Sequence, residues 1–298
     1  MIRADSMAGF RIGEFTVEIS ADLLGKSGDL AAGAKLFSVS GSDLFEQPDF
    51  SFAVSVKEKG SSRNLLFQED ECSYPTRMYQ LSCGEYECTF QNPADGGAQT
   101  YRIARDGKRI LLTEDTVEDG GYMLFHRMGS LFHIILLSRE ACVFHGVVME
   151  YRGMGILVMA SAGTGKTTHT DMWERREGAR IINGDRCLCR RLDGTWYAYG
   201  MPWAGSSGKI QNRKVRVCAV VMLERGQHNH VERLSGFEAE LYLLQRIFAP
   251  VSRGTLQENA FQYAQDIAEK IPVFKLMCRP DEEAVEVLKG AVENLNKM

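Results

Sequence analysis

A short glycine-containing loop between two regular segments constrains this chain more than any other feature. The loop is Ala160–Thr168, and the apolar run Met154–Met159 before it predicts a buried strand. The residues from Thr168 to Arg176 predict the start of a helix. A strand, a turn and a helix N-terminus in this order point backbone N–H groups at an anion, and the helix dipole adds to the attraction. This context predicts a phosphate-binding loop, whereas a glycine-lysine-threonine triplet alone is a common chance match.

The motif gives the residues of the loop specific roles. Lys166 is expected to reach the β- and γ-phosphates of a nucleotide, and the Thr167 hydroxyl to ligate Mg²⁺. The residues predicted to contact the nucleotide are Ser161, Ala162, Gly163, Thr164, Gly165, Lys166, Thr167 and Thr168. Ala160 replaces the first glycine of the pattern, so the turn survives only if this position does not need a positive φ. The loop therefore predicts a site for ATP, or a related phosphate donor, together with Mg²⁺.

Composition limits the class of protein. The 298 residues are 44% hydrophobic and 25% charged, which is enough for one large domain or two modest ones. The net charge is −4 and no basic run stands out, so we expect no nucleic-acid partner. The longest apolar stretches are too short to span a membrane, and the first residues lack the apolar segment of a signal peptide. We expect a cytoplasmic protein without a membrane partner, and a homo-oligomer stays open.

The cysteines do not indicate a metal site. Eight are present, but no CxxC pair or zinc-finger array occurs among them. Cys187, Cys189, Cys218 and Cys278 lie in strand-like runs, where a reduced cysteine acts as a small apolar residue. We therefore expect buried free thiols.

The chain divides into two regions. Residues 1–120 contain short alternating or apolar runs, which predict antiparallel hairpins in a β-rich N-terminal domain. These runs are Phe15–Ile19, Phe50–Val56, Arg77–Leu81, Glu87–Phe90 and Thr100–Ile103. No catalytic constellation is found in residues 1–120, so the role expected of this domain is that of a scaffold or of a docking site for a substrate or partner. Residues 121–298 alternate strand and helix signals, which predicts an α/β (α+β) catalytic domain.

Several elements of the second region are placed by their patterns. Tyr122–Leu137 predicts an amphipathic helix, with core contacts at Leu124, Met128, Leu131, Phe132 and Ile135. The predicted strands are Val143–Glu150, Ala179–Ile182, Arg216–Leu223 and Val273–Cys278. The predicted helices are Gly236–Phe248, Leu256–Lys270 and one that begins with Pro280 at its first position.

Asp185 lies at the tip of a short predicted strand. There a carboxylate is expected to act as a second metal ligand beside the phosphates. The sequence Asn183-Gly184-Asp185 also favours a simple turn, so the two interpretations compete.

The order of these segments resembles the catalytic domain of HPr kinase/phosphorylase. The matching residues are Phe144–Val148, the strand before the loop, the loop itself and Asn183–Arg186, within a resemblance that spans residues 140–298. That family shares the phosphate-loop fold of phosphoenolpyruvate carboxykinase, so the resemblance implies a mixed-sheet kinase core. It also implies that His145 matches the family's active-site histidine and that Asp185 matches the second residue of its acidic pair.

The departures from the family limit what the resemblance implies. Gly184 stands where the first acid of the pair is expected. The family's glycine-rich signature with its metal-binding glutamate, and its proline-arginine-glycine loop, are not found. HPr is therefore not expected as the acceptor, and carboxykinase activity is not expected either.

The combined prediction is a kinase that transfers the γ-phosphoryl group of ATP to a hydroxyl, foremost a serine or threonine of a protein or peptide. The predicted catalytic residues are His145, Lys166 and Asp185, and the predicted metal ligands are Thr167 and Asp185. Ser206–Gly208 is expected to close over the site, and Arg213 and Arg216 to add positive charge. Two alternatives stay open: a small-molecule kinase, and a non-catalytic nucleotide sensor that Gly184 favours.

Overall fold

The computed structural model divides the chain into two compact units. The first comprises residues up to Phe132, and the second comprises His133–Ala249 and the residues from Thr255 onward. The structure describes residues 6–39, 45–55, 62–69, 76–91, 98–113, 122–161, 163–249 and 255–295.

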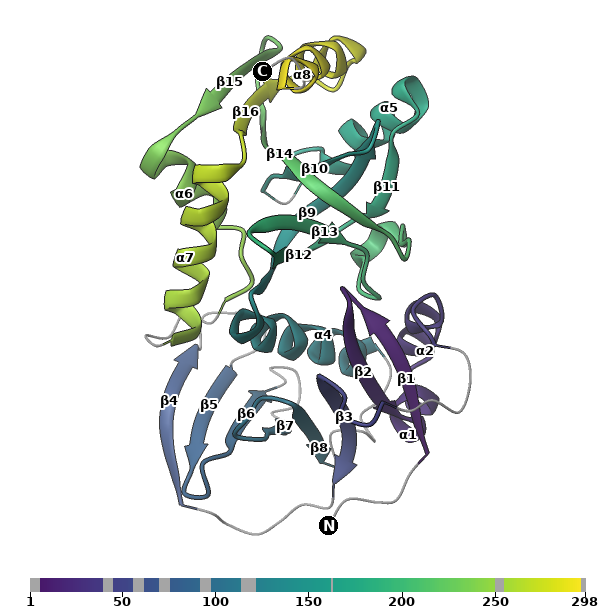
Figure 1. Ribbon diagram of the computed structural model, residues 1–298, viewed down its shortest axis with the longest axis vertical. Helices are drawn as coiled ribbons and strands as arrows, with labels where there is room; N and C mark the ends of the chain where they lie inside the picture. The colour runs from purple at the N-terminus through teal and green to yellow at the C-terminus, as the bar shows by residue number, and fades with distance from the viewer. Residues whose placement is uncertain are drawn as a thin grey trace. The chain divides into compact units, whose positions relative to one another are not determined.

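The first unit is built on one sheet, which has eight strands among the described residues (Figure 1). Its spatial order is β1-β2-β3-β8-β7-β6-β5-β4. The strands are β1 (Met7–Ile12), β2 (Phe15–Ser20), β3 (Phe50–Ser55), β4 (Arg63–Glu69), β5 (Thr76–Leu81), β6 (Tyr86–Gln91), β7 (Ala98–Ile103) and β8 (Arg109–Thr113). The predicted antiparallel pairing is confirmed for β5, β6 and β7, and β1, β4 and β8, which the sequence analysis did not predict, extend it as antiparallel partners of β2, β5 and β7.

The prediction of a purely antiparallel sheet is wrong at β3, which is parallel to both β2 and β8. Parallel neighbours need a long crossover, and the chain between β2 and β3 contains two short helices, α1 (Ala21–Lys26) and α2 (Gly28–Lys35). Ser20 and Ser27 cap them by accepting hydrogen bonds from backbone N–H groups.

The helix α4 (Tyr122–Leu136) is confirmed close to its predicted bounds. All five of its predicted core residues are buried. Phe132 packs edge-on against Phe50 of β3, with ring centroids 5.4 Å apart. The apolar stripe of α4 therefore contributes to the core of the sheet.

The second unit contains a mixed sheet, as expected. Its spatial order is β10-β9-β12-β13-β14-β16-β15, with β11 paired to β9 and a further pairing between β10 and β14. Within this sheet, only the β10–β14 and β14–β16 pairs are parallel among the described strands. The strands are β9 (Ala141–Tyr151), β10 (Met154–Met159), β11 (Arg180–Asn183), β12 (Arg186–Leu192), β13 (Thr195–Tyr199), β14 (Lys214–Arg225), β15 (His230–Leu234) and β16 (Val273–Cys278).

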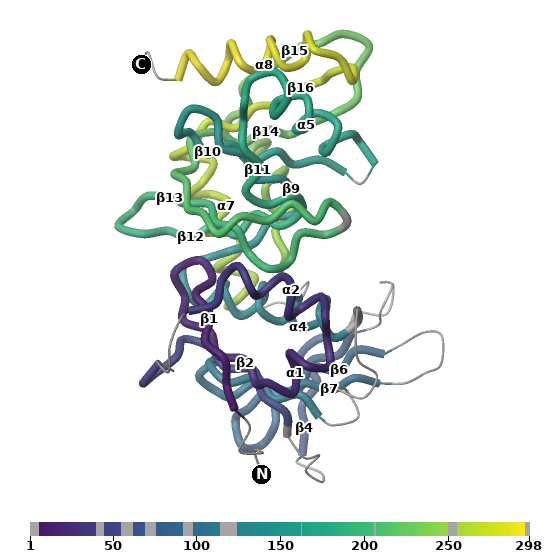
Figure 2. Tube along the Cα trace, turned by 90° about the vertical axis from the view of Figure 1, so that its right-hand side faces the viewer, coloured from purple at the N-terminus to yellow at the C-terminus, as the bar shows by residue number. Residues whose placement is uncertain are grey.

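Helices cover both faces of the parallel strands (Figures 1 and 2). Two neighbouring residues of β14 show this: Met222 belongs to the hydrophobic core formed with α6 and α7, whereas Leu223 belongs to the hydrophobic core formed with α5 and α8. The helices are α5 (Lys166–Glu177), α6 (Gly236–Leu244), α7 (Thr255–Lys270) and α8 (Glu282–Asn294). Since β10, β14 and β16 are parallel, their carboxyl ends lie at one edge of the sheet, and the 160–168 loop leaves from that edge.

Two helix boundaries differ from the prediction. The last helix begins at Glu282 rather than at Pro280, because the Asp281 side chain caps it by accepting a hydrogen bond from the Ala284 N–H. The helix predicted over Gly236–Phe248 ends at Leu244. The residues after it pair with β9 instead, since the Phe248 N–H donates to the Val143 carbonyl and the Arg246 carbonyl accepts from the His145 N–H.

The cysteines of the described residues are free thiols, and Cys142, Cys187 and Cys189 are buried. Burial raises the pKa of the Cys187 thiol well above its ordinary value. No helix in the described part of the chain combines the length and apolar character needed to cross a bilayer.

Replacing Gly155 by alanine is expected to destabilise the second unit. A Cβ at Gly155 would lie 2.6 Å from the Arg216 carbonyl oxygen, where the register between β10 and β14 shifts. Overpacking of this kind costs about 1–3 kcal/mol of the free energy of unfolding. The matched control is Gly290→Ala in α8, where a Cβ meets nothing within 4 Å and is expected to stabilise the helix by about 0.5–1 kcal/mol. Urea unfolding of both variants checks the opposite signs, and equal effects would contradict the prediction.

Candidate functional site

The 160–168 loop connects β10 to α5 and leaves the start of the helix uncapped. Gly163 and Gly165 have φ values of +73° and +115°, which explains why glycine is needed at both. No side chain caps α5, so its first N–H groups are available to a ligand. The helix begins at Lys166, two residues before its predicted start. Ala162 lies outside the described residues.

Ala160 fits the turn without strain. It is not among the residues with positive φ, and its side chain is buried. The replacement of the first glycine of the pattern is therefore compatible with the geometry of the loop.

Lys166 points back across the loop. Its Nζ donates a hydrogen bond to the Ala160 carbonyl, at 3.0 Å, and lies 3.3 Å from Nε2 of His145. Partial burial lowers the pKa of the Lys166 ammonium, and Asp185 partly opposes that shift. The lysine is held at the mouth of the loop by groups that a phosphate oxygen can replace.

His145 and Asp185 meet because β9 and β12 are antiparallel neighbours. Their register places Arg186 opposite His145, and the Gly146 N–H donates to the Asp185 carbonyl. His145 Nδ1 lies 3.4 Å from Asp185 Oδ1, which assigns the imidazole proton to Nδ1 and leaves the Nε2 lone pair facing Lys166. Burial lowers the pKa of His145; Asp185 opposes this shift, and Lys166 adds to it. The structure thus brings together all three predicted catalytic residues, with a neutral histidine between the other two.

Asn183 fixes the turn that carries Asp185. Its buried side-chain amide donates to the carbonyls of Met201 and Trp203, at 3.0 and 3.1 Å. Its side-chain oxygen accepts from the N–H groups of Asp185 and Arg186, at 3.1 and 2.8 Å. Every donor and acceptor position of the Asn183 amide is used, so this side chain ties the Asp185 turn to the Trp203 segment. Asp185 therefore lies on the turn that the sequence favours, and its role as a metal ligand stays a prediction.

The turn at Gly205–Ser207 packs directly on the Asp185 segment. A Cβ at Gly205 would lie 2.7 Å from Asp185 Cγ, and one at Gly184 would lie 1.9 Å from the Ser207 hydroxyl. The place of a first acidic side chain is thus filled by Ser207. This packing gives a physical reason for glycine at position 184.

Introducing the missing acid as Gly184→Asp is expected to lower the thermal midpoint. The new side chain must displace Ser207, at a cost of about 1–3 kcal/mol. The double variant Gly184→Asp/Ser207→Gly removes the obstructing side chain and is expected to recover most of that loss. Thermal unfolding of the two variants and of Ser207→Gly alone checks this. A single variant as stable as the parent would contradict the packing argument.

Two arginines that the sequence analysis did not select flank the loop. Arg246 Nη2 donates to the Ser161 hydroxyl at 3.0 Å, and Arg225 Nη2 donates to the Gly163 carbonyl at 2.5 Å. Arg246 reaches the loop because its main chain pairs with β9 beside His145. No local motif marks either position, so only the strand pairing identifies them.

The arginines that the sequence analysis did select lie elsewhere. Arg213 forms an ion pair with Glu150, at 3.0 Å, and Arg216 is an exposed residue of β14. The structure does not bring either of them to the loop.

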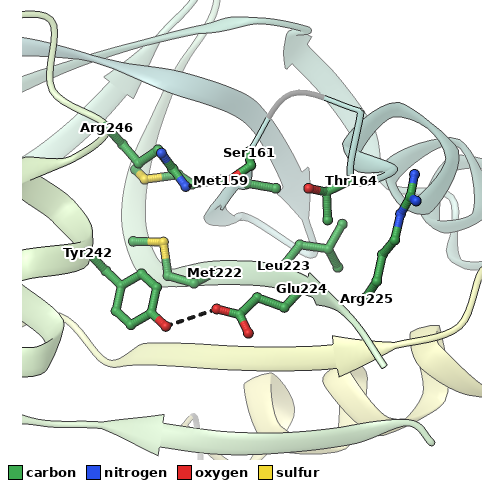
Figure 3. Close-up of a pocket in the computed structure, with 10 residues that line it drawn as sticks. Met159, Ser161, Thr164, Met222, Leu223, Glu224, Arg225, Tyr242 and Arg246 are labelled. Atoms are coloured by element: carbon green, nitrogen blue, oxygen red, sulfur yellow. Dashed lines mark hydrogen bonds between the residues drawn. The ribbon is translucent and has the colours of Figure 1, made fainter. Parts of the chain in front are cut away.

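Two cavities adjoin the loop. The first, here called the Tyr242 cavity, has a volume of about 340 Å³. Figure 3 shows Arg246 beside Ser161 and Arg225 beyond Thr164, with the Tyr242 hydroxyl donating to Glu224 at 2.9 Å. The second, here called the α5 cavity, has a volume of about 530 Å³. It lies along the first turns of α5 and the ends of β14 and β16, and its lining includes Gly165, Thr168, His169, Met172, Leu223, Arg225, Cys278 and Arg279.

The protein oxygen ligands of the site suit Mg²⁺ only if phosphate oxygens of a bound nucleotide also coordinate the ion. Thr167 is exposed on the first turn of α5, and Asp185 offers a carboxylate that also pairs with Arg186 at 2.9 Å. The described residues contain no group of three histidine, cysteine or acidic side chains that could hold a metal by themselves. A hydroxyl and a carboxylate are hard oxygen ligands, and Mg²⁺ in nucleotide sites usually takes few protein ligands and keeps several waters.

Comparisons with known proteins add little. No protein-family model matches the chain, and no curated protein matches it. Among solved structures, it is similar to the Hpr(Ser) kinase/phosphatase from Coxiella burnetii at 10% identity, over 52% of this chain and 98% of that chain, with a TM-score of 0.31. A likeness of that size carries no argument about activity, so a functional conclusion depends on the residues of the site.

Proposed function

We propose that the protein is a phosphotransferase that moves the γ-phosphoryl group of ATP, or of a related donor, to a hydroxyl acceptor. One observation supports this proposal above all. At the uncapped start of α5, Lys166 Nζ contacts His145 Nε2, and His145 Nδ1 contacts Asp185 Oδ1. A serine or threonine of a protein or peptide is the acceptor we favour, and a small-molecule hydroxyl is the alternative.

The loop holds the donor in this proposal. Backbone N–H groups of the loop and the first turn of α5 bind the phosphates, and Lys166 neutralises the β/γ end. Thr167 and Asp185 hold Mg²⁺ with the phosphate oxygens. The bound ion supplies positive charge against the charge of the phosphates.

His145 supplies the acid–base chemistry in the same proposal. When Lys166 turns toward the phosphates, the Nε2 lone pair becomes free to accept the proton of the acceptor hydroxyl. Asp185 Oδ1 accepts the hydrogen bond from Nδ1–H and stabilises the positive charge that develops on the imidazole ring. Arg246 adds positive charge beside Ser161. Phosphoryl transfer depends mostly on positioning and charge neutralisation, and this arrangement provides both.

The packing at Gly184 favours a second candidate, a nucleotide sensor without transfer activity. Only one acid, Asp185, is present on this turn, because Ser207 fills the space of the other. In a sensor, nucleotide binding beside Asp185 would change the packing of the 203–208 segment on this turn and so alter the surface offered to a partner.

Incubation with γ-labelled ATP and Mg²⁺ separates these functions. The acceptor pools are a protein extract and, separately, its small-molecule fraction. Label in a protein band supports the protein kinase, and label in a metabolite supports the small-molecule kinase. Saturable nucleotide binding without transfer or hydrolysis would overturn the kinase and support the sensor.

A further inference from the structure

We infer that the nucleobase of the phosphate donor binds in the α5 cavity, with the Nδ1–H of His169 donating to an acceptor atom of the base. The inference rests on the proposed function, because it concerns the donor of the same site. It extends that function by assigning the part of the protein that recognises a nucleoside.

The direction in which a bound donor must run indicates which cavity holds its nucleoside. The reacting end lies at His145, and the main chain of Arg246, which lines the Tyr242 cavity, is hydrogen-bonded to that residue. None of the described residues of the Tyr242 cavity belongs to α5. The α5 cavity instead continues from Gly165 along the helix, where the anion-binding N–H groups are. A donor whose terminal phosphate lies at His145 therefore places its nucleoside in the α5 cavity.

The topology supports the same placement. The α5 cavity is lined by residues that follow the carboxyl ends of β14 and β16, which are parallel to each other. In open α/β sheets, ligands bind in the crevice outside the carboxyl ends of such strands.

His169 carries a buried hydrogen-bond donor that has no partner among the described residues. His169 is 2% exposed, and its Nε2 accepts a hydrogen bond from Trp173 Nε1 at 3.0 Å. The proton of the neutral ring is therefore on Nδ1, which has no hydrogen-bond partner among the described residues. Buried polar groups are rarely left unpaired, because the lost bond costs free energy. His169 is among the residues that line the α5 cavity, and although its Nδ1 atom is itself buried, a ring nitrogen or carbonyl oxygen of a base bound against this wall is the acceptor that we assign to it.

The walls of the cavity suit a flat heterocycle. Met172 and Leu223 provide apolar surface, and the volume of about 530 Å³ lies in the usual range for small-molecule sites. The Arg279 guanidinium is held by Asp281 at 2.8 Å and Glu283 at 3.0 Å, so its plane is fixed at the rim. A planar guanidinium of this kind stacks well on aromatic rings.

Calorimetric titration of the whole protein with Mg·ATP and with Mg·tripolyphosphate tests the inference. The wild type is expected to bind Mg·ATP about tenfold or more tighter than Mg·tripolyphosphate. His169→Leu is expected to lower the ratio of the Mg·ATP affinity to the Mg·tripolyphosphate affinity about fivefold, without changing the affinity for Mg·tripolyphosphate. Arg279→Ala, at a half-exposed side chain, gives a second variant in case His169→Leu does not fold. Tyr242→Phe in the other cavity is the matched control and should leave the ratio unchanged.

Each other outcome has a defined meaning. Equal wild-type affinity for the two ligands would overturn the nucleobase site while leaving the phosphate site intact. If Tyr242→Phe lost the preference for Mg·ATP over Mg·tripolyphosphate while His169→Leu and Arg279→Ala kept it, the base would bind in the Tyr242 cavity and the inference would be overturned. Failure of the wild type to bind either ligand would overturn the proposed function itself.

Discussion

Replacing Lys166 by alanine is expected to abolish phosphoryl transfer and to weaken triphosphate binding strongly. The ammonium is the cation at the mouth of the loop, 3.3 Å from His145, and alanine leaves the terminal phosphates without it. Losing a preorganised group that stabilises charge in a transition state lowers turnover by about 1,000-fold. Steady-state kinetics with the acceptor found in the labelling experiment, and calorimetry with Mg·tripolyphosphate, measure the two effects.

The matched control for Lys166 is Lys289→Ala. Lys289 lies on α8 and pairs with Glu177, at the opposite end of α5 from Lys166. It is expected to leave kcat and affinity unchanged, because an ion pair at that position contributes little to the site. Near-normal turnover by Lys166→Ala would remove the loop from the mechanism.

The Asp185→Asn variant is expected to lower kcat by about 100-fold or more, while nucleotide binding in the absence of Mg²⁺ persists. The amide keeps the shape of the carboxylate but loses its charge, so it neither stabilises a protonated His145 nor binds Mg²⁺ well. Positioned acid–base groups contribute about 100-fold to 10,000-fold to turnover. Single-turnover rates and calorimetry with and without Mg²⁺ separate the catalytic effect from the metal effect.

Asp171→Asn is the matched control for Asp185. Asp171 lies on α5 and accepts a hydrogen bond from Lys209 at 2.6 Å, and in the described part of the chain no hydrogen bond or ion pair joins its side chain to His145. The partly exposed Asp171–Lys209 pair should matter little for turnover. If both asparagine variants kept full turnover, Asp185 would have no catalytic or metal role, and the His145–Asp185 contact would have no part in the transfer reaction.

Several elements of the chain follow from local patterns. Met154–Met159 is apolar throughout and forms β10 as predicted, and the stripe of α4 is buried at every predicted position. These elements depend on interactions within a few residues of one another, which periodicity reports well. The boundaries that differ, at Leu244 and Glu282, depend on a strand contact and a capping side chain respectively.

The N-terminal sheet shows where local patterns stop being informative. The runs that form β2, β3, β5, β6 and β7 are recognisable in the sequence, but β1, β4 and β8 were not predicted, and the parallel placement of β3 depends on the route of the chain through α1 and α2. A strand has the same local pattern whether its neighbour is parallel or antiparallel, so the residues of β3 do not encode the difference.

By itself, the sequence determined the loop, the strand before it and the helix after it, because backbone geometry and glycine placement over nine residues decide that unit. Only the tertiary structure decided which distant side chains join it. The register of β9 against β12 sets the contact of His145 with Asp185, and the return of the chain after α6 brings Arg246 to Ser161. The close packing of Ser207 explains Gly184. These contacts join residues that are far apart in the chain. They depend on the register of the strands and on the path of the chain, and no local sequence pattern records either of these.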